Sequence, residues 1–297
     1  MAITAKDVKK LRDLSGAGMM DCKKALTQTD GDLNAAVDFL RKKGLGAAEK
    51  KSGRIAAEGV VLATAQGNTG LLLEVNAETD FVSKNDAFTK FVTDLAAFII
   101  KEKPADIDIL KTLSFSEGLN VAEALSQLIA NIGENISIRR FQLVSVEAGS
   151  VGAYIHGAGK IGVLVGISGI ESDEASSTAR DIAMHVAAVN PDYTRDSDVP
   201  VPAVERERTV LSERAAASGK PEKIIARIVD GQLKKFFAES CLLNQDFVKD
   251  ADRTVGQVVS ALGEACDISD MVRFQLGEGI EKAENDFAAE VAAQVNG

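Results

Sequence analysis

The chain is poor in the side chains that most often carry out catalysis or bind metals. Its 297 residues include two histidines, His156 and His185, and no tryptophan. Histidine is the side chain that most often transfers protons near neutral pH, and it is a frequent zinc ligand. The sequence therefore gives little support to an enzyme with its own acid–base chemistry or to a metal site, and we expect no cofactor.

Cysteine is also scarce. Cys22, Cys241 and Cys266 are odd in number and form no Cys-x-x-Cys pair, so neither a disulfide framework nor a zinc site is predicted. We expect three reduced, mostly buried thiols in a cytoplasmic protein. The first residues, MAITAKDVKKL, lack the apolar core of a signal peptide. No apolar run approaches the roughly 18–20 residues that would span a membrane.

An excess of positive charge is missing as well. The formal net charge is −10, whereas proteins that bind nucleic acids use lysine and arginine to neutralise phosphates. The first 54 residues are the most basic region, but solvated helix faces explain that bias better than a binding patch does. We therefore expect neither a direct nucleic-acid partner nor a membrane partner.

The composition is globular, with 45% hydrophobic residues over a length that suits about two domains. Residues 1–54 are predicted to form a three-helix N-terminal domain and a linker. Thr4 and Asp32 suit the N-terminal caps of the first and third helices, SGAG (15–18) breaks the first helix, and Gly44 suits a stop. The linker is predicted at 45–54.

Two strand–turn–strand patterns follow, GVVLATAQGNTGLLLEVNA (59–77) and SVGAYIHGAGKIGVLVGIS (150–168). An amphipathic helix follows each pattern. We therefore predict two α+β core subdomains, 55–145 and 146–197, with helices on one face of a small antiparallel sheet. The apolar faces of the two helices are predicted to hold Phe88, Phe91, Val92, Leu95, Phe98 and Ile99, and then Ile182, Ala183, Val186 and Val189.

Residues 198–239 predict an antiparallel helical hairpin, a coiled coil inserted in the second subdomain, which resumes over 240–276. Pro221 suits the start of the second arm. About fourteen residues per arm would reach roughly 21 Å, and such an arm is expected to pack against a partner or a second copy. Residues 277–297 predict a C-terminal helical module. The apolar seam of the second arm is predicted to hold Ile224, Ile225, Ile228, Val229 and Phe236, and the terminal helix could dock through Phe287, Val291 and Val295.

The stretch GAGKIG (157–162) matches the Gly-x-Gly-x-x-Gly pattern of dinucleotide-binding proteins. That fingerprint requires the glycines to follow a strand and to open a helix. Here they lie between two strands, so we predict a hairpin turn. Lys160 is followed by Ile161 and not by Ser or Thr, so a phosphate-binding P-loop is not predicted either. His156 lies beside the turn and could contact a partner, while His185 lies next to the core.

The stretch NAETDFVSKN (76–85) places an acid and a large aromatic, Asp80 and Phe81, in a short connection between a strand and a helix. Phe81 could pack back on the first turn of that helix as a hydrophobic staple. It could instead be a rigid wedge that inserts into a partner, because aromatic residues are effective interface anchors. The residues alone leave both interpretations open.

Six segments together resemble the bacterial elongation factor Ts family: LRDLSGAGMMDCKKAL, EVNAETDFVSKN, NIGENISIRR, HGAGKIGVLV, AMHVAA and RFQLGEGIEK. The resemblance covers essentially the whole chain and is weakest in the helical hairpin. It implies the same α+β fold and a guanine-nucleotide exchange factor, which binds the GDP form of elongation factor Tu and promotes GDP release. It implies no chemical step and no resident metal.

The resemblance also implies the contacts. A loop of Thr79, Asp80, Phe81 and Val82 would enter the GTPase near its nucleotide-bound Mg²⁺. The partner would further meet the stretch from Leu11 to Lys23, the segment NIGEN (131–135), the surface around His156 and the C-terminal helix. Ser83, Ala158 and Lys160 depart from the usual family residues. A homodimer or a 2:2 complex through the hairpin or the core stays open. The lesser contact residues are Leu11, Met19, Met20, Lys23, Ile132, Gly133, Asn135 and His156.

Two other functions are weaker alternatives. A nucleotide-binding enzyme that uses the glycine-rich turn would bind nucleotide without a partner, whereas an exchange factor would not. An RNA-associated module that uses the basic N-terminal region would bind in a salt-sensitive manner, which the overall charge disfavours.

Overall fold

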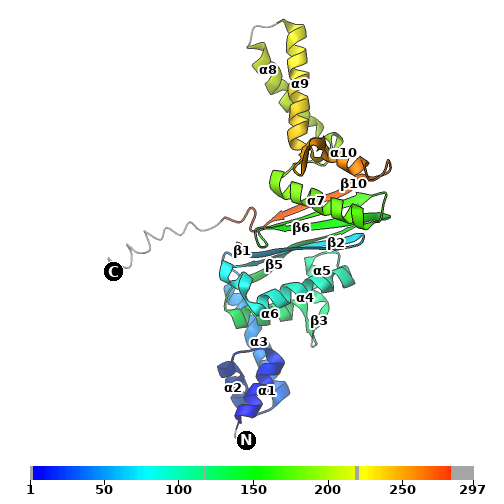
Figure 1. Cartoon of the computed structure of the whole chain (residues 1–297). Helices are drawn as coiled ribbons and strands as arrows, with labels where there is room; N and C mark the ends of the chain where they lie inside the picture. The colour runs from blue at the N-terminus through cyan, green and yellow to red at the C-terminus, as the bar shows by residue number, and fades with distance from the viewer. Residues whose placement is uncertain (1–2, 117, 218–220, 282–297) are drawn as a thin grey trace, which may run out of the picture. The chain divides into compact units, whose positions relative to one another are not determined.

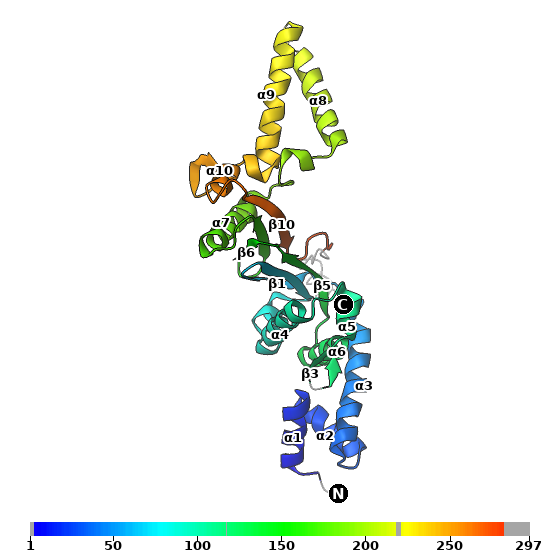
Figure 2. The ribbon, with the colours of Figure 1, turned by 90° about the vertical axis from the view of Figure 1, so that its right-hand side faces the viewer.

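The computed structural model of the chain describes residues 3–116, 118–217 and 221–281, and its ribbon is drawn in Figures 1 and 2. These residues divide into two compact units. The first unit takes its described residues from 1–61, 73–141 and 275–297, and the second from 62–72 and 142–274. Neither unit is one continuous stretch of sequence, so long-range packing decides much of each.

The first unit begins with the predicted three helices, α1 (Ala5–Ser15), α2 (Met19–Gln28) and α3 (Leu33–Lys51). Thr4 and Asp7 form a reciprocal capping box at the start of α1, and the Asp32 carboxylate accepts the Ala35 N–H at 3.0 Å. Such caps satisfy N–H groups that have no partner inside the helix. Gly16 ends α1 with a φ of 64°. The predicted caps and the break are confirmed.

The predicted end of the third helix is wrong. α3 continues through Gly44 to Lys51, so residues 45–51 are helical and do not belong to a linker. Gly44 is buried, and a Cβ placed there would lie 3.5 Å from the Ser126 carbonyl oxygen of α6 (Val121–Ile132). Close packing between the two helices therefore outweighs the weak helix propensity of glycine.

We expect Gly44→Ala to raise the free energy of unfolding by about 0.5–1 kcal/mol, because alanine restricts the unfolded chain and fits the space at van der Waals distance. Gly16→Ala is the matched control, and it should cost about 1–2 kcal/mol because its φ is left-handed. Urea denaturation of the two variants tests this contrast. Destabilisation by Gly44→Ala would contradict the expected fit of a methyl group between α3 and α6.

The first sheet has the strand order β1-β2-β5, from β1 (Glu58–Gln66), β2 (Thr69–Ala77) and β5 (Ile136–Ser145). α4 (Asp86–Glu102) and α6 lie on one side of it in Figure 1. Phe98 is only half-buried and meets Phe115 edge-on, with ring centroids 5.2 Å apart. The rest of the predicted apolar face of α4 is confirmed as buried. The short α5 (Ile107–Thr112), β3 (Ser114–Ser116) and β4 (Leu119–Asn120) connect α4 to α6.

Glu74 is a fully buried carboxylate in β2. It accepts hydrogen bonds from Arg139 Nη1 at 2.8 Å, Arg140 Nε at 2.6 Å and the Gly277 N–H at 2.8 Å. Burial alone would raise the pKa of Glu74, but these three donors together hold it below its ordinary value. The carboxylate thereby fastens the residues around Gly277 to β2 and β5.

We expect Glu74→Gln to lower the free energy of unfolding by about 3 kcal/mol at pH 7, because it removes the buried negative charge that faces the half-buried Arg139 and Arg140. The contribution of Glu74 is present above the ordinary glutamate pKa of about 4.3 and is lost as the pH falls through the lower folded-state pKa. Urea denaturation at pH 7 and at stepwise lower pH should therefore show the two proteins converging in acid. The exposed Glu102→Gln serves as control, and a difference that persists unchanged in acid would contradict the assignment.

The second unit contains β6 (Gly149–His156), β7 (Ile161–Ser168) and β10 (Asp267–Gln275) in the order β10-β7-β6. β6 and β7 are antiparallel, with His156 opposite Ile161. Residues 157–160 form the turn between them and lead into β7. The glycine-rich stretch is therefore the predicted hairpin turn, and it presents no helix N-terminus to a phosphate.

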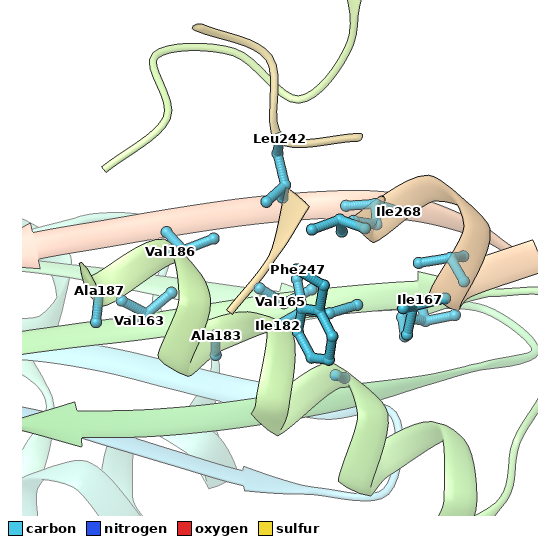
Figure 3. Packing of buried hydrophobic residues seen from close by; sticks show 14 residues of the cluster. Val163, Val165, Ile167, Ile182, Ala183, Val186, Ala187, Leu242, Phe247 and Ile268 are labelled. Carbon is cyan, nitrogen blue, oxygen red and sulfur yellow. The ribbon is translucent and has the colours of Figure 1, made fainter. Parts of the chain in front are cut away.

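α7 (Asp173–Val189) covers one face of this sheet (Figure 1). A Cβ at Gly152 of β6 would lie 2.1 Å from the Arg180 amide nitrogen of α7, so the helix rests directly on the strand. Figure 3 shows Ile182, Ala183 and Val186 packed against side chains of β7 and of the chain that follows the hairpin. The predicted apolar face is thus largely confirmed, but Val189 is exposed, since the last turn of the helix extends beyond this cluster.

The inserted hairpin consists of α8 (Val201–Ala216) and α9 (Glu222–Ser240), side by side in Figures 1 and 2. Leu211 and Ala215 of α8 pack against Val229 and Leu233 of α9. Ile224, which was predicted in the seam, is exposed instead. The chain then forms the short elements β8 (Asp246–Phe247), β9 (Asp250–Thr254) and α10 (Val255–Ser260).

His185 is buried in α7, as its predicted position next to the core required. Its Nε2 lies 2.9 Å from Gln245 Oε1, and the Val248 N–H donates to its Nδ1 at 3.3 Å. Burial lowers the pKa of His185, against the smaller opposing effect of Gln245. This neutral imidazole joins α7 to the residues after the hairpin, which is a structural role.

The three cysteines are free thiols, with Cys22 and Cys241 buried and Cys266 half-buried. Burial, with nearby Asp196, raises the pKa of Cys241 to about 12, so this thiol is unreactive. Among the described helices none is long and apolar enough to cross a membrane. The predicted C-terminal helix, with Phe287, Val291 and Val295, lies outside the described residues.

Candidate partner-binding site

The connection between β2 and α4 exposes one large aromatic side chain. Asp80–Lys84 form a single short 3₁₀ helix. Phe81 is 79% exposed, whereas Val82, the next residue, is 4% exposed and packs inward. The hydrophobic-staple interpretation of Phe81 is therefore wrong, because a staple would bury this ring. We refer to residues 79–84 as the Phe81 loop.

The N-terminal end of the Phe81 loop is held by the segment that follows α6. The Thr79 N–H donates to Glu134 Oε2 at 2.9 Å, and the Thr79 hydroxyl donates to Glu134 Oε1 at 2.7 Å. In return, the Asn135 N–H donates to Glu78 Oε1 at 2.6 Å. Each segment thus supplies a carboxylate to the backbone of the other. We call Glu78, Thr79, Glu134 and Asn135 the crossed clamp.

The end of α3 is tied to the same place. Arg54 Nη1 approaches Glu78 Oε1 at 3.4 Å, and the Asn135 side-chain amide donates to the Arg54 carbonyl at 2.7 Å. Lys51 Nζ donates to the Gly133 carbonyl at 2.9 Å. Three segments that are distant in sequence therefore meet beneath the loop, and α3 links the N-terminal helices to it.

The C-terminal end of the loop is fixed by Asn85. Its N–H donates to the Val82 carbonyl at 2.9 Å, while its side-chain oxygen accepts the N–H groups of Ala87 at 2.9 Å and Phe88 at 3.3 Å. One residue thus closes the 3₁₀ helix and caps α4. With both ends hydrogen-bonded, the loop presents Asp80 and Phe81 on a defined backbone.

The other predicted contact residues are distributed over both units. In the first unit, Gly133 is exposed and Ile132 half-buried beside the clamp, while Asn135 is buried as part of it. In the second unit, His156 is exposed at the end of β6, with Nδ1 3.2 Å from the Tyr154 hydroxyl.

The N-terminal helices carry the remaining predicted contacts. Met19, Met20 and Lys23 are exposed on α2. Leu11 has no exposed surface and packs in the core of the three helices. A direct contact through the Leu11 side chain would require those helices to open, and its contact with a partner stays a prediction.

Sequence reasoning missed Glu78 and Glu134. Glu134 lies within the NIGEN segment, but its function depends on Thr79, which is 55 residues away in sequence. The sequence around Glu134 does not predict this pairing. A glutamate that follows a helix usually faces solvent.

The site lacks the arrangement of a chemical active centre. In the part of the chain that the structure describes, no three His, Cys, Asp or Glu side chains gather as they would around a metal ion. The groups of the clamp are acceptors engaged by backbone and hydroxyl donors. The geometry suits recognition of a partner by an exposed ring on a fixed loop.

A family model described as Elongation factor TS matches residues 78–278, more than half of the chain. The chain belongs to the elongation factor Ts family. Members of this family are nucleotide exchange factors for elongation factor Tu and not enzymes. The predicted family and the absence of a chemical step are thereby confirmed. Members occur in the cytoplasm or in organelles, so the cytoplasmic placement of this chain stays a prediction.

The matched range starts at Glu78, the first residue of the crossed clamp. It includes the whole Phe81 loop, the segment after α6 and the turn beside His156. Residues 1–77, with Met19, Met20 and Lys23, precede it. The family assignment therefore rests on the part of the chain that builds the loop.

Two neighbouring residues of the loop should differ in how strongly truncation changes the stability of the protein. We expect Val82→Ala to lower the free energy of unfolding by about 2 kcal/mol, at roughly 0.8 kcal/mol per buried methylene-sized group. Phe81→Ala should change it by less than about 0.5 kcal/mol, as is usual for exposed positions. Urea denaturation measures both. A large loss of stability in Phe81→Ala would mean that the ring is packed in the free protein.

Proposed function

We propose that this chain binds the GDP form of elongation factor Tu and promotes GDP release by inserting Asp80 and Phe81 beside the nucleotide-bound Mg²⁺. The observation that carries the proposal is the exposed Phe81 ring on a loop hydrogen-bonded at both ends. Burying such a ring in a partner is favourable by about 1.5–3 kcal/mol. The free protein gains nothing from that ring, so its benefit lies in a complex.

A loop that is ordered in advance binds more tightly, because little conformational entropy is lost on association. The crossed clamp and the Asn85 cap provide this order. Val82 contributes by burying its side chain under the loop, which leaves the neighbouring Phe81 turned outward. Thr79 and Val82 thus shape the loop, while Asp80 and Phe81 meet the partner.

Displacing the ion weakens nucleotide binding for a simple electrostatic reason. Mg²⁺ neutralises the phosphates of a bound nucleotide and is itself held by oxygen ligands of the GTPase. A ring that displaces the elements carrying those ligands, with a carboxylate that competes for the same cations and donors, removes this compensation. Factor and nucleotide then oppose each other reciprocally, and each 1.4 kcal/mol of coupling changes affinity about tenfold.

Further contacts belong to the same proposal. Met19 and Met20 are exposed on α2 beside Lys23, and methionine adapts well to a partner surface. Gly133 and Ile132 lie next to the clamp, and His156 contributes from the second unit. A homodimer or a 2:2 complex through the hairpin or the core stays a prediction.

We expect the chain to accelerate release of fluorescent GDP from its matched elongation factor Tu, and Phe81→Ala to reduce that acceleration at least tenfold, about 1.4 kcal/mol. Stopped-flow measurement of GDP release tests this. Ile109→Ala is the control, since Ile109 is another exposed apolar residue of the same unit, and it should leave the rate unchanged.

The role of Mg²⁺ has its own test. If the loop acts on the ion, the acceleration should shrink when a chelator has already removed Mg²⁺ from the GTPase. Undiminished acceleration under chelation would exclude the ion from the mechanism. Full activity of Phe81→Ala would assign exchange to other contacts, and no acceleration by the wild-type chain would reject the proposed function.

A further inference from the structure

We propose that Glu134 is a positioning residue for exchange: it holds the Phe81 loop in its binding conformation before the partner arrives. The consequence for exchange rests on the proposed function above, whereas the positioning itself concerns the free chain. Glu134 does this by accepting both hydrogens that Thr79 can donate. The side chain acts through Thr79 and not by touching the partner.

The hydrogen bonding of Thr79 is unusual for its position. Thr79 occupies the N-terminal cap of the 3₁₀ helix, yet its side chain makes no capping hydrogen bond to that helix. A threonine in such a position commonly accepts from an N–H of the first turn. Here the hydroxyl donates to Glu134 instead, and the Thr79 N–H does the same. The start of the loop is therefore fixed from outside.

The direction of Glu134 follows from the residue before it. Gly133 ends α6 in the left-handed conformation, with a φ of 89°. A residue with a Cβ is strained there, so glycine permits the chain to turn sharply from α6 toward β5. That turn places Glu134 against Thr79 and the Asn135 N–H against Glu78. Lys51 holds the Gly133 carbonyl, which ties the turn to α3.

The two contacts are of a strong type. Hydrogen bonds to an ionised carboxylate are shorter and about twice as strong as those between neutral groups. Both oxygens of Glu134 are used, so the carboxylate fixes the orientation of Thr79 as well as its position. Removing one acceptor should let the loop sample conformations in which Phe81 is aimed elsewhere.

The kinetic signature of such a role is specific. When only a fraction of a protein is competent to bind, its apparent affinity falls by that fraction. Once the partner has bound, the loop is in place and GDP leaves at the normal rate. Loss of positioning should therefore raise the concentration needed for half-maximal exchange and leave the maximal rate unchanged.

The test uses Glu134→Gln, which keeps the size of the side chain and replaces one acceptor oxygen with a donor. We expect half-maximal GDP release to require about tenfold more of the variant, at an unchanged maximal rate. Glu102→Gln, an exposed glutamate at the end of α4, is the control and should match the wild type. An unchanged half-maximal concentration, or a reduced maximal rate, would overturn the proposal.

A double-mutant cycle separates positioning from direct contact. Thr79→Val removes the hydroxyl donor and keeps the backbone. If Glu134 acts through Thr79, the double variant should be little worse than Glu134→Gln alone. If the two substitutions instead multiplied each other's effect on the half-maximal concentration, Glu134 would contact the partner independently of Thr79, and the proposal would be wrong.

Hydrogen exchange in the free chain gives a readout that needs no partner. The amides of residues 79–84 should exchange at least fivefold faster in Glu134→Gln, while those in the middle of α4 should not change. Unchanged protection of the loop would overturn the clamp. Lost protection together with full activity of Phe81→Ala would support the clamp and reject the proposed wedge, so the two ideas fail separately.

Discussion

A loop can offer an apolar ring to a partner only if its own backbone polar groups are satisfied without burying that ring. Buried or poorly solvated N–H groups without partners are costly. Here the Thr79 N–H is satisfied by Glu134 and the Asn135 N–H by Glu78, while Asn85 serves the first N–H groups of α4. The ring of Phe81 therefore does not have to be buried to hold the loop in place. The positions of α3, α6 and β2 at this point follow from the same set of contacts.

Carboxylates serve two different purposes in this acidic chain. Glu74 is buried among arginines and holds the residues near Gly277 to the sheet. Glu78 and Glu134 are half-buried and take their hydrogen bonds mainly from the backbone and a hydroxyl. The ion pairs of Glu74 stabilise the fold. The hydrogen bonds of Glu78 and Glu134 instead order the Phe81 loop on the surface, which matters for a protein whose function is to change the affinity of another protein for its nucleotide.

Features that depend on neighbouring residues could be predicted from the sequence. Thr4 and Asp32 cap helices because their side chains reach N–H groups three residues away. The turn at 157–160 followed from its place between two strands. Gly44 failed as a stop because packing on α6 decided its conformation. Val189 and Ile224 were misassigned for related reasons, since tertiary neighbours determine which apolar residues of a helix are covered.

The residues of the candidate site likewise differ in how far the local sequence could predict them. Asp80 and Phe81 could be singled out because an aromatic beside an acid is unusual in a short connection. Whether the ring was buried could not be decided, because that depends on how Val82 and the first turn of α4 pack. The segment that contains Glu134 could be singled out, but its pairing with Thr79 could not, since Thr79 lies on another segment of the chain.

Because Asn85 serves two helices, the connection between β2 and α4 cannot change its length freely. It ends one helix and begins the next, and only Asp80–Lys84 lie between it and Thr79. A residue added or removed there would rotate Asp80 and Phe81 relative to both ends of the loop. Either the Asn85 cap or the crossed clamp would then have to break. The length of the connection is therefore fixed by its two hydrogen-bonded ends, whereas the side chains at Asp80 and Phe81 can vary by substitution.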